Sequence, residues 1–136
     1  MLVQLEKSAI DLGIVVSDLE ASIAFYEGVL GFVDEGEIPF PGGGTMRRLG
    51  CGDTTIKLVH LAKNPKARAP GGGIQGATGY RYWTMSVSNL DEIAKACEEA
   101  GYAIPLKPIE IPAAGRFLIV EDPDGNWVEF AEYADA

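Results

Sequence analysis

The sequence has few of the residues that build metal centres and disulfide frameworks. Its 136 residues include one histidine, His60, and two cysteines, Cys51 and Cys97, which form no spacing motif. Imidazole and thiolate are the usual ligands of zinc and of most other transition metals, so a histidine-rich or cysteine-rich centre is excluded. We expect two free thiols, as in a reducing compartment, with Cys97 as a small core residue on a helix.

Basic residues and long apolar runs are also scarce. Eleven lysines and arginines stand against 20 aspartates and glutamates, which gives a net charge of −9, and there is no basic run. Nucleic acid is therefore not expected as a partner. No apolar stretch approaches the ~20 residues of a membrane span, and the N-terminus lacks a signal-peptide pattern. We expect a cytoplasmic protein without a membrane partner, whose acidic surface attracts cations.

An internal repeat organises the chain. Val-Ser-Asp-Leu-Glu at residues 16–20 matches Val-Ser-Asn-Leu-Asp at residues 87–91, and each precedes a helical pattern that ends at a glycine. The repeat predicts an α+β fold made of two tandem βαβββ modules, at about residues 8–61 and 80–133. A chain of this length buries roughly two thirds of its unfolded surface, so we expect one domain over residues 1–136.

Alternation and helical spacing predict the elements of each module. In the first module, residues 17–20 predict a capping box in which Ser17 caps the helix and Glu20 reaches back. The linker at residues 62–79 is too rich in glycine and proline for a helix or strand, and we expect a mobile linker or lid. The expected strands are residues 10–16, 32–37, 45–50, 54–61, 80–87, 103–111, 116–121 and 126–133, and the expected helices end near residues 30 and 100.

The same repeat singles out four strand positions. Asp11 falls opposite Tyr82, and Lys57 falls opposite Glu129. Glu129 lies in a strand that follows the turn Asp-Pro-Asp-Gly-Asn at residues 122–126, whose Pro, Gly and Asp residues favour a tight turn. Glu129 is a carboxylate in the middle of a strand, and the other three repeat-related positions also carry polar groups. This recurrence indicates a functional site.

Strand parity separates an apolar face from a polar and aromatic one. The apolar face takes the helices, and the other has the small and polar residues of a ligand-binding concavity, although a solvated outer face is the alternative. One of Arg47 and Arg48 should share the polar face, where it could hold a carboxylate or phosphate. The predicted polar face comprises Asp11, Gly13, Val15, Thr55, Lys57, Val59, Tyr80, Tyr82, Thr84, Ser86, Trp127, Glu129 and Ala131.

Three motifs carry a family resemblance. The stretches at residues 16–26, 29–32 and 122–129 resemble the glyoxalase/bleomycin-resistance/extradiol-dioxygenase superfamily, also called the vicinal oxygen chelate proteins. The resemblance implies that mixed sheets of the two modules curl into a cup with the helices on its outer face, commonly completed by homodimerisation. In metal-dependent members it implies a divalent ion held by histidine and glutamate side chains from four strands.

The sequence departs from that ligand pattern at three of the four positions. Asp11 and Tyr82 stand where the resemblance implies histidine, Lys57 stands where it implies glutamate, and only Glu129 matches. An ammonium repels a metal ion and offers no lone pair until it is deprotonated. We therefore expect no cofactor, and Lys57 disfavours a divalent metal. The ammonium of Lys57 would instead lie between the carboxylates of Asp11 and Glu129, as an ion-paired triad.

Two functions remain open. The first is a small-molecule-binding protein that sequesters a drug-like or cationic ligand, with Tyr80, Tyr82 and Trp127 as stacking surfaces and Thr55, Thr84 and an arginine as polar contacts. The alternative is a glyoxalase-like lyase or isomerase for a small carbonyl compound. Its candidate catalytic residues are Tyr82, Lys57, Glu129 and Asp11. A ring-cleaving dioxygenase needs two histidines on iron, and the single histidine of this sequence disfavours it.

Overall fold

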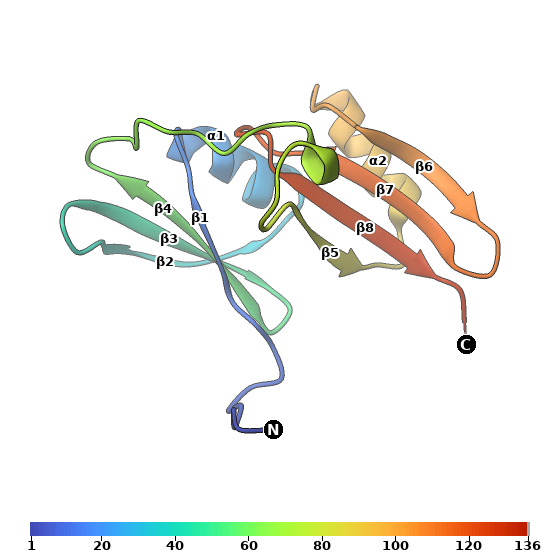
Figure 1. Ribbon diagram of the computed structural model, residues 1–136, viewed down its shortest axis with the longest axis horizontal. Helices are drawn as coiled ribbons and strands as arrows, with labels where there is room; N and C mark the ends of the chain where they lie inside the picture. The colour runs from blue at the N-terminus through green and yellow to red at the C-terminus, as the bar shows by residue number, and fades with distance from the viewer. Residues whose placement is uncertain (136) are drawn as a thin grey trace. The chain divides into compact units, whose positions relative to one another are not determined.

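The computed structural model describes residues 1–135, and its chain divides into two compact units. Unit 1 is Met1–Lys66, and unit 2 begins at Ala67. The boundary falls within the linker predicted at residues 62–79. Each unit contains one four-stranded mixed sheet and its own helices (Figure 1). The extent of the domain as a whole stays a prediction.

Unit 1 is built in the order expected of a βαβββ module. Its strand order is β1-β4-β3-β2, with β1 parallel to β4 and the other neighbours antiparallel. Helix α1 packs against β4 (Figure 1). The elements are β1 (Leu12–Val15), α1 (Leu19–Ile23), the π-helix η1 (Ala24–Val29), β2 (Val33–Pro39), β3 (Gly44–Cys51) and β4 (Thr54–Leu61).

Unit 2 repeats this topology. Its strand order is β5-β8-β7-β6, with β5 parallel to β8, and α2 packs against β7 and β6 (Figure 1). The α+β class and the two modules are confirmed. The elements are the 3₁₀ helix η2 (Gly73–Gln75), β5 (Tyr82–Ser86), α2 (Leu90–Glu99), β6 (Leu106–Ile111), β7 (Gly115–Glu121) and β8 (Trp127–Tyr133). The turn η2 lies in the linker, where no helix was expected.

The start of unit 1 differs from the sequence prediction. Strand β1 begins at Leu12 because the amide of Thr55 bonds the side chain of Asp11 (2.9 Å) and not a strand carbonyl. Asp11 therefore precedes the strand, and Ile10, expected on the apolar face, is 81% exposed. The helix cap was also wrong: Asp18 caps α1 by accepting from the amide of Ala21, since a carboxylate oxygen is a strong N-cap acceptor.

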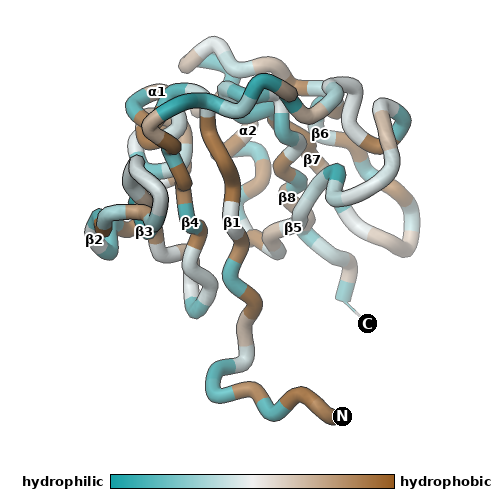
Figure 2. Tube along the Cα trace, turned by 60° about the vertical axis from the view of Figure 1, so that its left-hand side comes forward, coloured by the Kyte–Doolittle hydropathy of each residue, from teal (hydrophilic) through white to brown (hydrophobic). Residues whose placement is uncertain are grey.

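Most of the core of each unit forms from the apolar face that strand parity predicts, but Val59 and Ala131, which parity assigns to the polar face, are buried as well. In β4 and β8, the alternate residues Ile56, Leu58, Val128 and Phe130 are buried. Figure 2 shows β1 as a mostly apolar stretch along its strand. Cys97 on α2 is fully buried, and burial raises the pKa of its thiol to about 11, which confirms a core role. Among residues 1–135, no helix is long and apolar enough to cross a membrane.

Candidate functional site

One row of residues crosses the polar face of the unit 1 sheet. Strand register pairs Gly13 with Lys57, Lys57 with Arg48, and Arg48 with Gly36. Residues paired directly across neighbouring strands point to the same face. Lys57 and Arg48 are both half-buried. Two cations therefore lie side by side on this face, with a glycine on each flank.

Register decides which arginine faces this side. Arg47 is paired with the buried Leu58 and lies on the opposite face. Its guanidinium is neutralised there by Glu37 at 3.3 Å and Asp34 at 3.7 Å. Arg48 is thus the arginine of the polar face, and Arg47, a candidate ligand contact in the sequence, pairs with two carboxylates of β2 on the opposite face.

The carboxylate of Asp11 is engaged by a different lysine from the one expected. Lys7 Nζ lies 2.6 Å from Asp11 Oδ1, and the Thr55 amide donates to the same oxygen. The hydrogen bond from Lys7, then that from the Thr55 amide, holds the pKa of Asp11 below its ordinary value, with a smaller contribution from the charge of Lys57. The expected Asp11–Lys57 ion pair is therefore wrong within unit 1. The contact of Lys57 with Glu129 stays a prediction.

Sequence reasoning missed Glu35. The hydroxyl of Thr55 donates to Glu35 Oε1 at 2.9 Å, and a Cβ at Gly50 would lie 2.8 Å from Glu35 Oε2. The carboxylate thus lies over Gly50, beside Thr55 on the polar face. A β-bulge between Asp34 and Gly36 changes the alternation of β2 there. In the sequence, the one indication of this bulge was Gly36, a glycine inside an expected strand.

The polar face of unit 2 carries a carboxylate held by a hydroxyl. Thr84 is paired with Glu129 across the parallel strands β5 and β8, and its hydroxyl donates to Glu129 Oε1 at 2.6 Å. Glu129 is half-buried, and Thr84 is exposed. One hydrogen bond leaves acceptor capacity on the carboxylate, because two oxygens offer about four lone-pair sites. Glu129 is therefore positioned by its neighbour and able to accept from a ligand.

The aromatic residues of unit 2 differ in their accessibility. Tyr80 precedes β5 and is fully exposed, and Tyr82, the first residue of β5, is 49% exposed. Trp127 is paired with Tyr82, and its indole Nε1 donates to Glu121 Oε1 at 3.1 Å. A Cβ on Gly73 would lie 2.2 Å from the indole ring. One face of Trp127 is therefore covered, and Tyr82 is the more open stacking surface.

A strap, defined here as residues 70–76, provides that cover. Arg81 Nε donates to the carbonyl of Gly73 at 2.7 Å, and Arg81 Nη2 donates to the carbonyls of Pro70 at 2.7 Å and Gly71 at 3.2 Å. Three carbonyls on one guanidinium fix the strap to the start of β5. The linker thus has defined contacts, where its composition indicated a mobile segment.

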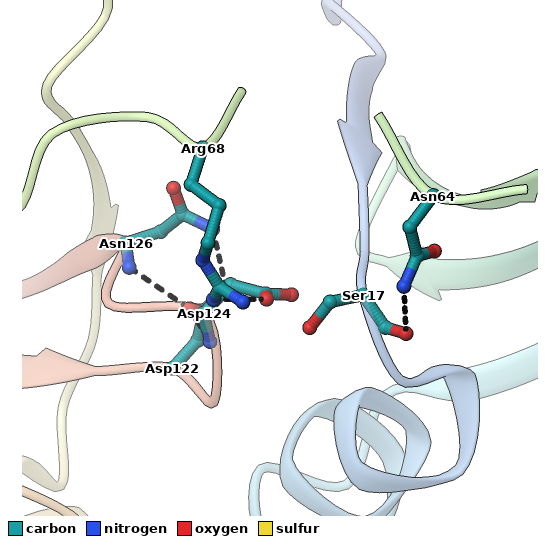
Figure 3. Close-up of polar contacts among 6 residues, drawn as sticks. All are labelled: Ser17, Asn64, Arg68, Asp122, Asp124 and Asn126. Atoms are coloured by element: carbon teal, nitrogen blue, oxygen red, sulfur yellow. Dashed lines mark hydrogen bonds and ion pairs between the residues drawn. The ribbon is translucent and has the colours of Figure 1, made fainter. Parts of the chain in front are cut away.

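The turn before β8 is organised by a buried carboxylate. Asp122 is 4% exposed, and its Oδ1 accepts from the amides of Asp124 and Asn126, both at 2.9 Å. Its Oδ2 accepts from Asn126 Nδ2 (Figure 3). Arg68 pairs with Asp124 at 3.0 Å (Figure 3). This network confirms the predicted turn and sets where β8, and with it Glu129, begins. In unit 1, Asn64 Nδ2 donates to the Ser17 carbonyl (Figure 3).

The four repeat positions do not fit the divalent ion that the resemblance implies. Their polar groups are the carboxylates of Asp11 and Glu129, the phenol of Tyr82 and the ammonium of Lys57. The ammonium has no lone pair to give, and Asp11 Oδ1 is already bonded to Lys7. In residues 1–135, no three histidine, cysteine, aspartate or glutamate side chains form a group suited to a metal.

Comparison with known proteins establishes the family. The model of the Glyoxalase/Bleomycin resistance protein/Dioxygenase superfamily matches residues 9–130. The chain belongs to this superfamily.

Several relatives are similar over most of their length. The virulence protein STM3117 of Salmonella typhimurium is 28% identical over 90% of this chain and 81% of its own. A glyoxylase/bleomycin resistance protein/dioxygenase domain from Frankia sp. EAN1pec has a TM-score of 0.80 and 18% identity over 96% of this chain and 94% of its own. TnmS3, an antibiotic binding protein from Streptomyces sp. CB03234, has a TM-score of 0.68 and 22% identity over 96% of this chain and all of its own. The two structures show that the fold is shared.

Proposed function

We propose that the protein binds a small molecule on its polar sheet faces without a bound metal, and that it sequesters a drug-like or cationic compound. The observation that carries this proposal is the replacement of a metal donor by Lys57 at the repeat position of Glu129. The faces keep hydrogen-bonding and aromatic groups, which is what a binding site needs. The similarity of fold to an antibiotic binding protein supports the same reading.

The unit 2 face suits the cationic part of such a ligand. Glu129 offers a carboxylate that Thr84 positions, and Tyr82 offers a half-exposed ring in the neighbouring row. Carboxylates and aromatic faces are the two groups that attract an organic cation most strongly. The proposal also includes the homodimer that the family resemblance implies and a cytoplasmic location.

One observation favours the second candidate, a glyoxalase-like lyase or isomerase. The Thr84 hydroxyl fixes Glu129 in one orientation, as a general base requires, and Tyr82 lies one row away as a possible acid. Turnover of a small carbonyl compound, lost in Tyr82→Phe, is the property that distinguishes this candidate from a binding protein.

A thermal-shift screen of cationic, neutral and acidic drug-like compounds tests the proposal, followed by calorimetry on those that stabilise the protein. We expect stoichiometric binding, recovery of the compound unchanged by mass spectrometry, and roughly tenfold weaker binding in Glu129→Gln, from the loss of a charged acceptor. Glu99→Gln, at the end of α2, is the matched control and should bind normally. Conversion of a compound would instead establish the enzyme, and a screen without any binder would contradict both.

A further inference from the structure

We propose that Lys57 and Arg48 form a binding site for an oxyanion, a carboxylate or a phosphate, on the polar face of unit 1. This inference rests on the proposed function, because it names the acidic group that a ligand presents to this unit. It concerns the face of unit 1 alone and is separate from the contact with a cationic group that we propose for Glu129 in unit 2. The sequence left open which arginine faces this side, so the pair becomes visible only from the strand register.

The row that contains the two cations has space on the sheet surface. A Cβ built on Gly13 would have no atom within 4 Å, so the flank of Lys57 is open. On the other flank, a Cβ on Gly36 would lie 3.4 Å from Arg48 Nη2, which places the guanidinium over the glycine of the β2 bulge. The row therefore presents two cationic side chains and no other side chain.

Neither Lys57 nor Arg48 forms an ion pair with a carboxylate among the described residues of unit 1. Like charges placed directly opposite across two strands destabilise a sheet. Lys57 makes no hydrogen bond or ion pair with the described residues of its own unit and acts on Asp11 only through its charge, while Asp11 is bonded to Lys7 and Glu35 to Thr55. A ligand with negative charge would remove this repulsion, which gives the site a physical reason to bind one.

Arg48 is held in place without losing its charge. Its Nη2 donates to the backbone carbonyl of Glu35 at 2.7 Å, which orients the guanidinium but supplies no counter-charge. Guanidinium has five N–H donors in a planar fork, so donors remain for a second acceptor. A fixed fork beside a flexible ammonium matches the oxygens of a carboxylate or phosphate. Arg47, in contrast, is neutralised by two carboxylates on the opposite face.

The test is an NMR titration of the ¹⁵N-labelled full chain with inorganic phosphate and, separately, with acetate. We expect saturable shifts of the amides of Gly13, Gly36 and Lys57. Lys57→Gln and Arg48→Gln should each weaken binding roughly tenfold or more, because each loses a charge-assisted contact. Arg47→Gln is the matched control and should bind as the wild type does. The anion that binds more tightly identifies whether the ligand group is a phosphate or a carboxylate.

A second variant tests the site while leaving both cations in place. Gly13→Glu puts a carboxylate into the open space beside Lys57, where it should compete with the added anion and abolish the shifts. The spectrum of each variant shows whether its fold is intact. Absence of saturable shifts in the wild type, or wild-type affinity in both Lys57→Gln and Arg48→Gln, would overturn the assignment.

The two proposals fail in different ways. Binding of phosphate or acetate, with no compound retained in the drug-like screen, would keep the anion site and contradict sequestration. Binding of screened compounds through Glu129, with no response to either anion, would keep the proposed function and overturn the role of Lys57 and Arg48.

Discussion

The two sheets share one topology but carry opposite charge at the equivalent place. In unit 1, Lys57 lies between Gly13 and Arg48 in the strand register. In unit 2, Glu129 lies between Thr84 and Ile119. The backbone of the module is set by the buried alternate residues, so the positions that face the other way are free to differ. The repeat has thus kept its fold while its two polar faces have acquired different chemistry.

The units also differ in what holds their turns and covers their faces. The turn before β8 is built on the buried Asp122, whereas the corresponding turn before β4 is exposed at Gly52 and Asp53. In unit 2 the strap covers Trp127 through Gly73. Unit 2 therefore depends on specific side-chain contacts where unit 1 depends on a simple hairpin, and substitutions at matched sites measure that difference.

The largest difference is expected at the two turns. Asp122→Ala removes a buried carboxylate that accepts from two amides and from Asn126 Nδ2, and it should lower the free energy of unfolding by at least about 3 kcal/mol, since bonds to charged groups are worth ~1.5–3 kcal/mol each. Asp53→Ala, in the exposed turn of unit 1, should change it by less than about 0.5 kcal/mol. Urea unfolding measures both. Equal losses would show that the two turns are held in the same way.

The next effect concerns the strap. Gly73→Ala should lower the free energy of unfolding by about 1–3 kcal/mol, because its Cβ would overlap the indole of Trp127 and its φ of +57° is unfavourable for alanine. The displaced strap should also shift the tryptophan emission to the red. Gly71→Ala, in the same strap, has open space around its Cβ and should do neither. An unchanged Gly73→Ala would mean that the strap does not rest on Trp127.

The smallest expected effect is the change in stability when the carboxyl groups of two exposed ion pairs are protonated. Lys7 beside Asp11 in unit 1, and Arg116 beside Asp91 in unit 2, each hold the pKa of the carboxyl below its ordinary value. A lowered carboxyl pKa adds stability that is present above about pH 4, the unfolded value, and is lost as the pH falls through the folded value. Lys7→Gln should raise the pKa of Asp11 and leave that of Asp91 unchanged. Carboxyl-carbon NMR titration measures both, and an unmoved Asp11 would rule out Lys7 as the cause.

Much of the fold could be predicted from local pattern and the repeat. Strand β4 begins at Thr54 and ends at Leu61 as alternation indicates, and the parallel pairing of β5 with β8 follows from the topology of the module. The predicted element boundaries were wrong where a side chain, and not the backbone, accepts the hydrogen bond of an amide. The Asp11 side chain accepts from the amide of Thr55, so β1 is shorter than predicted. The Asp18 side chain, and not that of Ser17, caps α1.

The site was less predictable because it depends on contacts between distant residues. The face of Arg48 is set by its register with Lys57, which the hairpin fixes and the sequence leaves ambiguous. Glu35 reaches Thr55 only through a β-bulge, and the cover of Trp127 by Gly73 joins residues far apart in the chain. Parity predicted the polar positions, but not which of them would be paired, covered or open.

Metal content tests the proposed metal-independent binding most directly. The protein would be incubated with Ni²⁺, Zn²⁺, Mn²⁺, Fe²⁺ and Mg²⁺, desalted and measured by mass spectrometry. We predict that no ion is retained, because Lys57 offers an ammonium where a donor is needed and Asp11 is bonded to Lys7. Retention of about one ion per chain would contradict this account and would turn attention to metal-dependent lyase chemistry.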